Sequence, residues 1–237
     1  MTDHPGSIVP EDATAVSVDE AEARAGLVLA LRGRGIGDRS LLSAIERLPR
    51  RLFLSARYHR LAYEDASIPI ECGQTVSAPS YVARVVQALA LTRDHRVLEV
   101  GTGSGYQAAV LSLLVKQVYS IEIVAALAQQ ATARLGRLGY DNVTVRSGDG
   151  YRGWQEHAPF DAIIVTAAAP SIPPPLLEQL KSGGCMVIPV GLPYGRQILT
   201  VVNKDERGKV SVEELLPVAF VPLTGDHRQG VKSGDDS

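Results

Sequence analysis

Residues 97–105 read Val97-Leu98-Glu99-Val100-Gly101-Thr102-Gly103-Ser104-Gly105, a short apolar strand that stops at three alternating glycines. A helix-like segment follows at once. Glycine permits a sharp turn with positive φ and lets a ligand lie directly against the main chain. The amides that open the next helix then face the same space. The stretch therefore predicts a ligand cradle at the carboxyl end of a parallel strand, where open α/β sheets bind their ligands.

The spacing of residues within this loop distinguishes between three kinds of ligand that a glycine-rich loop can bind. A dinucleotide loop needs a glycine at its sixth position, which is Tyr106 here, and a P-loop needs a lysine that this loop lacks. Glu99, just before the loop, suits a ligand with positive charge, and S-adenosylmethionine carries an ammonium and a sulfonium group. The alternative is a tight strand-to-helix turn without a ligand, although three alternating glycines cost backbone entropy without an evident structural return.

Strands and helices alternate around the loop. This pattern predicts an α/β fold, a doubly wound Rossmann-like parallel sheet with helices on both faces, an N-terminal helical cap and a C-terminal β-hairpin. The expected strands are 96–100, 117–122, 143–147, 160–166 and 184–191, with the hairpin at 197–203 and 210–216. The expected helices are 19–34, 38–47 (with Asp38 as N-cap), 79–91, 105–115, 124–138 and 174–181.

The same reading divides the chain into four segments. Residues 1–18 are expected to form a flexible N-terminal extension, and residues 225–237 a flexible tail. Residues 19–95 are interpreted as a helical cap on the substrate side of the site. Residues 96–224 then form the S-adenosylmethionine-binding α/β domain, including the C-terminal strands.

Composition narrows the classes of function. The formal net charge of −2 gives no electrostatic argument for nucleic acid, and the small basic cluster of Arg47, Arg50 and Arg51 is interpreted as a solvated face. The two cysteines, Cys72 and Cys185, fit reduced thiols of a cytoplasmic protein better than a disulfide framework. No apolar run is long enough for a membrane span, no signal peptide is recognisable, and the scattered histidines give no case for a metal.

Two further acids follow neighbouring strands. Glu122 ends the strand after the glycine loop, where an acid of a doubly wound fold accepts hydrogen bonds from two ribose hydroxyls. Asp149, followed by Gly150, comes after the third strand and could accept the adenine amino group. The alternatives are a surface acid that caps a helix at Glu122 and a plain turn at Asp149. Both acids support an adenosine ligand without choosing the cofactor.

Together these elements resemble class I S-adenosylmethionine-dependent methyltransferases, and flanking stretches narrow the resemblance to the protein-L-isoaspartate O-methyltransferase family. The specific motif is Gly73-Gln74-Thr75-Val76-Ser77-Ala78-Pro79, which is similar to that family's Gly-Gln-Thr-Ile-Ser-X-Pro signature. The first cofactor motif, from Glu99 to Leu111, matches nearly residue for residue. Likeness extends over about residues 20–224 and includes the stretches 160–170, 179–184, 188–191 and 220–223.

The resemblance implies an S-adenosylmethionine-dependent carboxyl O-methyltransferase that acts on the free carboxylate of L-isoaspartyl residues in damaged proteins. It implies Ser77 as the catalytic residue, which orients the acceptor, although a serine here could instead cap the following helix. The implied cofactor-binding residues are Thr75, Glu99, Gly101, Thr102, Gly103, Ser104, Gly105, Glu122, Asp149 and Gly150. Val221, Pro222 and Leu223 are the implied substrate-binding residues, unless they are only an apolar terminal strand.

The expected partners are isoaspartyl proteins and peptides, without nucleic acid, membrane or metal, and the chain is expected to be a monomer. Two departures from the family pattern bear on substrate preference: Glu71-Cys72 precedes the signature glycine, and the N-terminal extension is long. Two other functions stay open: a methyltransferase for a small molecule or nucleic acid, and a noncatalytic domain that keeps the fold. Nucleic-acid methyltransferases of this fold commonly need a basic face, and those that methylate amino groups need an Asn/Asp-Pro-Pro-Tyr/Phe motif. Neither feature is visible in this sequence.

Overall fold

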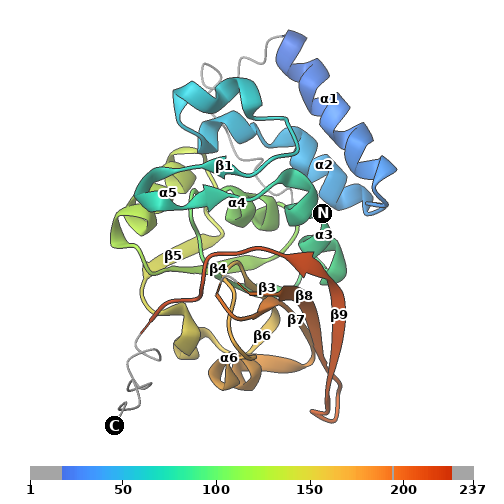
Figure 1. Cartoon of the computed structure of the whole chain (residues 1–237), viewed down its shortest axis with the longest axis vertical. Helices are drawn as coiled ribbons and strands as arrows, with labels where there is room; N and C mark the ends of the chain where they lie inside the picture. The colour runs from blue at the N-terminus through green and yellow to red at the C-terminus, as the bar shows by residue number, and fades with distance from the viewer. Residues whose placement is uncertain (1–17, 194, 226–237) are drawn as a thin grey trace, which may run out of the picture.

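The strands of a central sheet run in the order β5-β4-β3-β6-β7-β8-β9 in this computed structural model, which describes residues 18–193 and 195–225 (Figure 1). Nearly all of the two segments expected to be flexible, residues 1–17 and 226–237, lies outside the described residues. The strands of this sheet are β3 (Arg96–Val100), β4 (Gln117–Glu122), β5 (Val143–Ser147), β6 (Phe160–Val165), β7 (Leu180–Gly191), β8 (Gln197–Lys204) and β9 (Val210–Val218).

Strand direction confirms the predicted class of fold. The strands β5, β4, β3, β6 and β7 are parallel, and β8 and β9 follow as antiparallel neighbours that form the predicted hairpin at the edge. One difference concerns the start of β7, which begins at Leu180 rather than at residue 184. Its pairing with β6 shifts register between Phe160 and Ala162, and Gly183 adopts a left-handed φ of 79° in the irregular stretch. Residues 180–183, which were expected to end the helix and lead into the strand, therefore lie inside a bulged strand.

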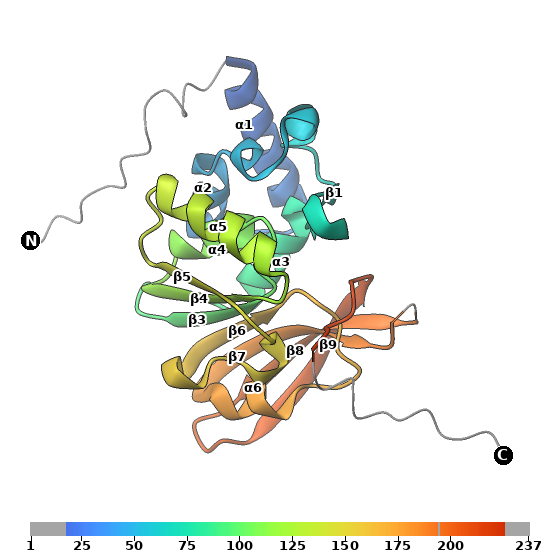
Figure 2. The ribbon, with the colours of Figure 1, turned by 90° about the vertical axis from the view of Figure 1, so that its left-hand side faces the viewer.

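Helices cover the two faces of the sheet unequally (Figure 2). One face carries α1 (Val18–Gly33), α2 (Arg39–Arg47), α3 (Pro79–Ala88), α4 (Tyr106–Ser112) and α5 (Ala125–Arg137), whereas α6 (Pro174–Gln179) lies on the other. Asp38 caps α2 as predicted, because its side chain accepts a hydrogen bond from the Leu41 amide. Helix α3 ends three residues earlier than predicted, where Ala90 turns the chain with a φ of 46°.

Alternating strand residues build one hydrophobic core on each side of the sheet. Val97 and Ile164 pack with α1 to α5, and Leu98 and Ile163 pack on the opposite face with α6. The first core is continuous from Leu27 in α1 to the sheet, so the N-terminal helices share it with the glycine loop's own strand. The division at residues 95/96 stays a prediction.

A short hairpin connects the N-terminal helices to α3. Its strands are β1 (Ile68–Pro69) and β2 (Thr75–Val76), and the 3₁₀ turn η3 (Glu71–Gly73) joins them. The remaining 3₁₀ turns in the described chain are η1 (Arg50–Phe53), η2 (Ala56–Leu61), η4 (Gly150–Arg152) and η5 (Gln155–His157). Across residues 18–193 and 195–225, no helix is long and apolar enough to cross a membrane. The hairpin places the Gly-Gln-Thr-Val-Ser stretch beside the glycine loop.

Candidate active site

A cavity of about 710 Å³ opens at the carboxyl ends of the parallel strands. Its walls come mainly from the glycine loop, from Ser67 and residues 74–77, and from residues 218–224 at the end of β9 and beyond, with smaller contributions from the ends of other strands, among them Glu122 and Gly150. Most of the residues predicted for the site lie on these walls, namely Thr75, Ser77, Gly101, Thr102, Gly103, Ser104, Glu122, Gly150, Val221, Pro222 and Leu223. The fold thus brings together segments that are more than 100 residues apart in the sequence.

Gly101 is where the loop needs glycine most. Its φ is 99°, and a Cβ placed there would lie 2.0 Å from Thr166 Oγ1. The Thr166 hydroxyl lies 3.0 Å from both the Val100 and Gly101 carbonyl oxygens, toward which it donates. Thr166 therefore fixes the start of the loop from the end of β6, a role that the sequence did not reveal because its partners are backbone atoms on another strand.

Glu122 is held in a defined orientation at the cavity wall. Its side chain is buried, and its two oxygens accept hydrogen bonds from the amides of Gly103 (2.8 Å) and Val124 (2.9 Å). The N-cap position of α5 is Val124, so Glu122 is not the surface capping acid of the alternative interpretation. Each carboxylate oxygen retains capacity for a further donor such as a ligand hydroxyl.

Glu99 lies beneath the loop rather than on the cavity wall. The carboxyl is completely buried and accepts hydrogen bonds from Ser120 Oγ (2.5 Å) and Gln107 Nε2 (3.0 Å). The Ser120 hydroxyl also lies 2.6 Å from Thr102 Oγ1, which connects Glu99 to the loop. Burial raises the pKa of Glu99 from its ordinary value of 4.5 to about 7. The position supports the loop from below and does not contact the cavity directly.

Gly105 and Asp149 also lie outside the cavity lining. Gly105 is the left-handed N-cap of α4, and a Cβ there would lie 3.3 Å from Leu135 of α5, so the glycine permits close packing of two helices. Asp149 accepts a hydrogen bond from the Tyr151 amide and caps η4. Its neighbour Gly150 does face the cavity and packs against β3, because a Cβ would lie 2.3 Å from Val100 Cγ1.

Ser77 lies half-buried on the cavity wall that follows β2, and its hydroxyl forms no hydrogen bond within the described part of the chain. The alternative interpretation as a helix cap does not hold, because Ala78 is the N-cap of α3 and makes no side-chain capping bond. Asp65 takes that role instead: its Oδ1 accepts a hydrogen bond from the Ser80 amide at 2.8 Å. The Ser77 hydroxyl is therefore available to a ligand.

The wall formed by residues 218–224 is held beside the sheet by backbone hydrogen bonds. Ala168 donates its amide to the Val221 carbonyl (2.8 Å), and Leu223 donates its amide to the Ala168 carbonyl (2.7 Å). The Val221 side chain is 43% exposed, whereas Leu223 is buried in the core. The Val221 carbonyl and the Leu223 amide are thus already used within the protein, whereas Val221 itself remains exposed.

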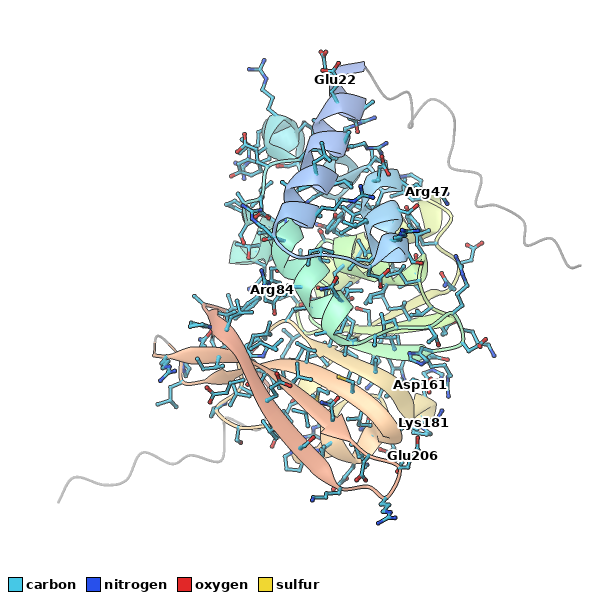
Figure 3. All side chains as sticks on the ribbon, turned by 90° about the vertical axis from the view of Figure 1, so that its right-hand side faces the viewer. Glu22, Arg47, Arg84, Asp161, Lys181 and Glu206 are labelled. Atoms are coloured by element: carbon cyan, nitrogen blue, oxygen red, sulfur yellow. The ribbon has the colours of Figure 1, made fainter. Side chains whose placement is uncertain are left out.

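The basic cluster is the clearest error of the sequence interpretation. Arg47 does lie at the surface at the end of α2 (Figure 3), and Arg51 pairs with Glu20 at 2.7 Å. Arg50, however, is completely buried and donates hydrogen bonds to three carbonyl oxygens. Sequence spacing alone did not reveal this burial, because the carbonyl partners of Arg50 are backbone atoms 12 to 27 residues further along the chain.

The cavity offers little acid–base chemistry. Its lining holds no histidine, cysteine or lysine, and the described residues contain no cluster of side chains suited to a metal. Two tyrosines line it, and burial raises the pKa of Tyr106 to about 12 and that of Tyr81 still further. Both phenols therefore keep their protons at neutral pH. The geometry suits a reaction that depends on positioning two ligands rather than on a general base.

Comparison with known proteins places the chain in a defined group. The family model for protein-L-isoaspartate(D-aspartate) O-methyltransferases matches residues 22–228. Protein-L-isoaspartate O-methyltransferase 2 of Syntrophobacter fumaroxidans is 56% identical over 195 residues, which cover 82% of this chain and 79% of the relative. The protein-L-isoaspartate O-methyltransferase of Parvibaculum lavamentivorans is 52% identical over 209 residues, which cover 87% of this chain and 94% of the relative.

Solved structures agree with this grouping. A protein-L-isoaspartate O-methyltransferase superposes with a TM-score of 0.79 at 31% identity and covers 86% of this chain and 66% of its own. A Plasmodium falciparum protein solved in complex with S-adenosyl-L-homocysteine has a TM-score of 0.72 at 25% identity, over 84% of this chain and 97% of its own.

Proposed function

Because the chain belongs to the protein-L-isoaspartate O-methyltransferase family, we propose that it transfers a methyl group from S-adenosylmethionine to the free carboxylate of L-isoaspartyl residues in damaged proteins. The observation that carries the proposal is a juxtaposition. The glycine loop, Glu122 and the signature serine, Ser77, all line the same cavity. A methyl donor on one wall and a carboxylate acceptor on the other would then meet inside it.

The loop wall suits the donor. Gly101 and Gly103 expose backbone at positive φ, so a ligand can lie against the main chain there. The fixed Glu122 carboxylate suits a pair of ribose hydroxyls, and Thr102, Ser104 and Gly150 complete the cofactor set on the cavity wall. When bound, S-adenosylmethionine supplies a sulfonium methyl group whose carbon–sulfur bond breaks as the bond to the acceptor oxygen forms. In this proposal Glu99, Gly105 and Asp149 contribute by supporting the loop and the turns around it.

The wall that carries Ser77 suits the acceptor. The unpaired Ser77 hydroxyl can donate to a carboxylate oxygen and orient it, while Thr75, two residues earlier on β2, belongs with the proposed cofactor-binding residues. An isoaspartyl carboxylate is ionised at neutral pH, so the reaction needs no base from the protein. The protein's part is to hold the acceptor in line and to exclude water from charges that neutralise during transfer. The nitrogen of the following peptide bond in the acceptor then attacks the methyl ester, methanol leaves and a succinimide forms, and hydrolysis of that succinimide returns part of the acceptor to normal aspartyl linkage.

Methyl transfer to two synthetic peptides tests this function. The peptides are identical except that one carries an isoaspartyl and the other a normal aspartyl linkage, and labelled S-adenosylmethionine is the donor. We expect transfer to the isoaspartyl peptide alone. Transfer to both peptides, or to neither while the cofactor still binds, would contradict the proposal.

The Ser77→Ala variant assigns the chemistry to this cavity. We expect turnover to fall by about tenfold or more, because the variant loses one hydrogen bond to the charged acceptor carboxylate. The affinity for S-adenosylhomocysteine should stay nearly unchanged. Collapse of cofactor affinity would instead make Ser77 a structural or cofactor-binding residue.

The proposal includes the expected partners and place of action. The acceptors are isoaspartyl proteins and peptides, and the enzyme acts on them as a cytoplasmic monomer, without nucleic acid or membrane. The formal net charge of −2 and the single carboxylate on the cavity wall support a protein acceptor over a polyanionic one. Size-exclusion chromatography with light scattering tests the monomer, since a stable dimer would elute at twice the mass of 25.3 kDa.

A further inference from the structure

We propose that Arg50 is a positioning residue for methyl transfer, which sets the place of Ser77 relative to the glycine loop; this inference rests on the proposed function. Arg50 lies at the start of η1, far from the cavity in sequence. Its guanidinium donates hydrogen bonds to the carbonyl oxygens of Ala62 (2.8 Å), Ala66 (3.1 Å) and Ser77 (3.0 Å). Ala62 and Ala66 belong to the connection between η2 and β1, whereas Ser77 follows β2, so this side chain joins two segments of the chain.

The burial of Arg50 is costly. Its side chain is completely inaccessible, and within residues 18–193 and 195–225 no carboxylate lies within ion-pair distance of it. A buried charge without an ionic partner is tolerated only when hydrogen bonds satisfy it. The two terminal nitrogens of Arg50 have such bonds, but its Nε atom has none, which adds to the cost. An apolar side chain would fill the same space at lower cost. The three carbonyls are therefore the reason for a guanidinium at this place.

Arg50 fixes the backbone of the cavity wall that carries Ser77, through the carbonyl oxygens of Ala66 and Ser77. The carbonyl oxygen of Ser77 belongs to the residue whose hydroxyl faces the cavity, and Ala66 precedes Ser67, which also lines it. The amide of Ser80, three residues after Ser77, donates a hydrogen bond of 2.8 Å to Asp65 Oδ1. The turn that carries the Ser77 hydroxyl is thus held from both ends by side chains outside it.

The same guanidinium contacts the cofactor wall. Its central carbon lies 5.4 Å from the ring centroid of Tyr106, the first residue of α4 after the glycine loop. Phe53 holds that ring edge-on at 5.7 Å. Arg50 therefore bridges the two walls, bonded to the acceptor side and stacked on the donor side. A side chain in this place fixes the separation that in-line transfer depends on.

A double-mutant cycle tests the inference. Arg50→Lys keeps the positive charge but cannot span three carbonyls, because a lysine ammonium is a point charge on a flexible stem. With the isoaspartyl peptide, we expect kcat to fall by about tenfold while the Kd of S-adenosylhomocysteine stays within about threefold. In a Ser77→Ala background, Arg50→Lys should lower kcat by less than about twofold, because the hydroxyl it positions is already absent.

Arg51→Lys is the matched control, since the next residue makes a partly buried ion pair with Glu20 that lysine can retain, and this variant should leave kcat unchanged. Equal kcat for the Arg50→Lys and Arg51→Lys enzymes would overturn the inference, and so would effects of Arg50→Lys and Ser77→Ala that simply multiply. Loss of fold in both Arg50→Lys and Arg50→Gln, checked by circular dichroism, would assign Arg50 to stability and also overturn it. Absence of transfer by the unaltered enzyme would refute the proposed function instead.

Discussion

Glu99 shows how a buried carboxyl makes stability depend on pH. Its folded pKa of about 7 lies above the ordinary 4.5 because burial disfavours the charged form. The protonated form therefore stabilises the fold fully below pH 4.5, and this stabilisation is lost as the pH rises through 7. Between pH 5.5 and pH 8 we expect the free energy of unfolding to fall by about 2 kcal/mol through this group. Urea unfolding at the two pH values measures the change, and Glu99→Gln, which cannot ionise, should remove it.

Glu122 bears on affinity rather than stability. Its two backbone donors fix the carboxylate without help from a ligand, so ligand hydroxyls would meet a preorganised acceptor. We expect Glu122→Ala to weaken binding of S-adenosylhomocysteine by about 1–3 kcal/mol, the usual loss for a charged hydrogen-bond partner. Isothermal titration calorimetry gives the value directly, with Glu213→Ala on the exposed face of β9 as the control. Unchanged affinity in the Glu122 variant would remove this residue from the cofactor site.

At the scale of elements, α3 depends on an acid from outside its own sequence. Asp65 accepts from the Ser80 amide and also pairs with Arg34 of the α1–α2 connection. We expect Asp65→Ala to lower the free energy of unfolding by about 1–2 kcal/mol, as for loss of a helix cap, whereas Asp65→Asn keeps an oxygen acceptor and should lose less. Ser77→Ala should change it by less than about 0.5 kcal/mol. The opposite order in thermal unfolding would return the capping role to Ser77.

Elements with strong local signals were predictable from sequence. The apolar runs gave β3, β4 and β5 to the residue, and Asp38 gave the start of α2. The start of β7 was missed because Gly183 and Gly184 signal a turn, while a bulge between β6 and β7 is decided by pairing with another strand. Arg50 and Thr166 were missed for the same kind of reason. Their partners are backbone carbonyls distant in sequence, and no residue type marks a carbonyl that needs a donor.

On the scale of the whole molecule, the shared core predicts a single unfolding transition. The only tryptophan of the sequence, Trp154, packs on the α6 face, whereas most helix lies on the opposite face. Because α1 shares a continuous core with the sheet, we expect tryptophan fluorescence and far-ultraviolet circular dichroism to give the same urea midpoint. A separate cap formed by residues 19–95 would lose its helical signal at a lower urea concentration.

Two leucines of α1 sharpen this test. Leu31 is completely buried and Leu29 is 65% exposed. Leu31→Ala should lower both urea midpoints together and reduce the free energy of unfolding by about 2–5 kcal/mol. Leu29→Ala should leave both midpoints unchanged. A shift confined to the circular dichroism signal would show that α1 unfolds on its own.

The wall formed by residues 218–224 has a consequence for biosynthesis. It pairs with Ala168 and contacts Gln197, and it follows every other part of the cavity in the order of translation. A growing polypeptide on the ribosome therefore carries the glycine loop, Glu122 and Ser77 long before the pocket can close around them. A chain released by premature termination before residue 218 would hold the donor side and lack one side of the acceptor groove. The enzyme can begin to repair other proteins only after residue 224 of its own chain has been made.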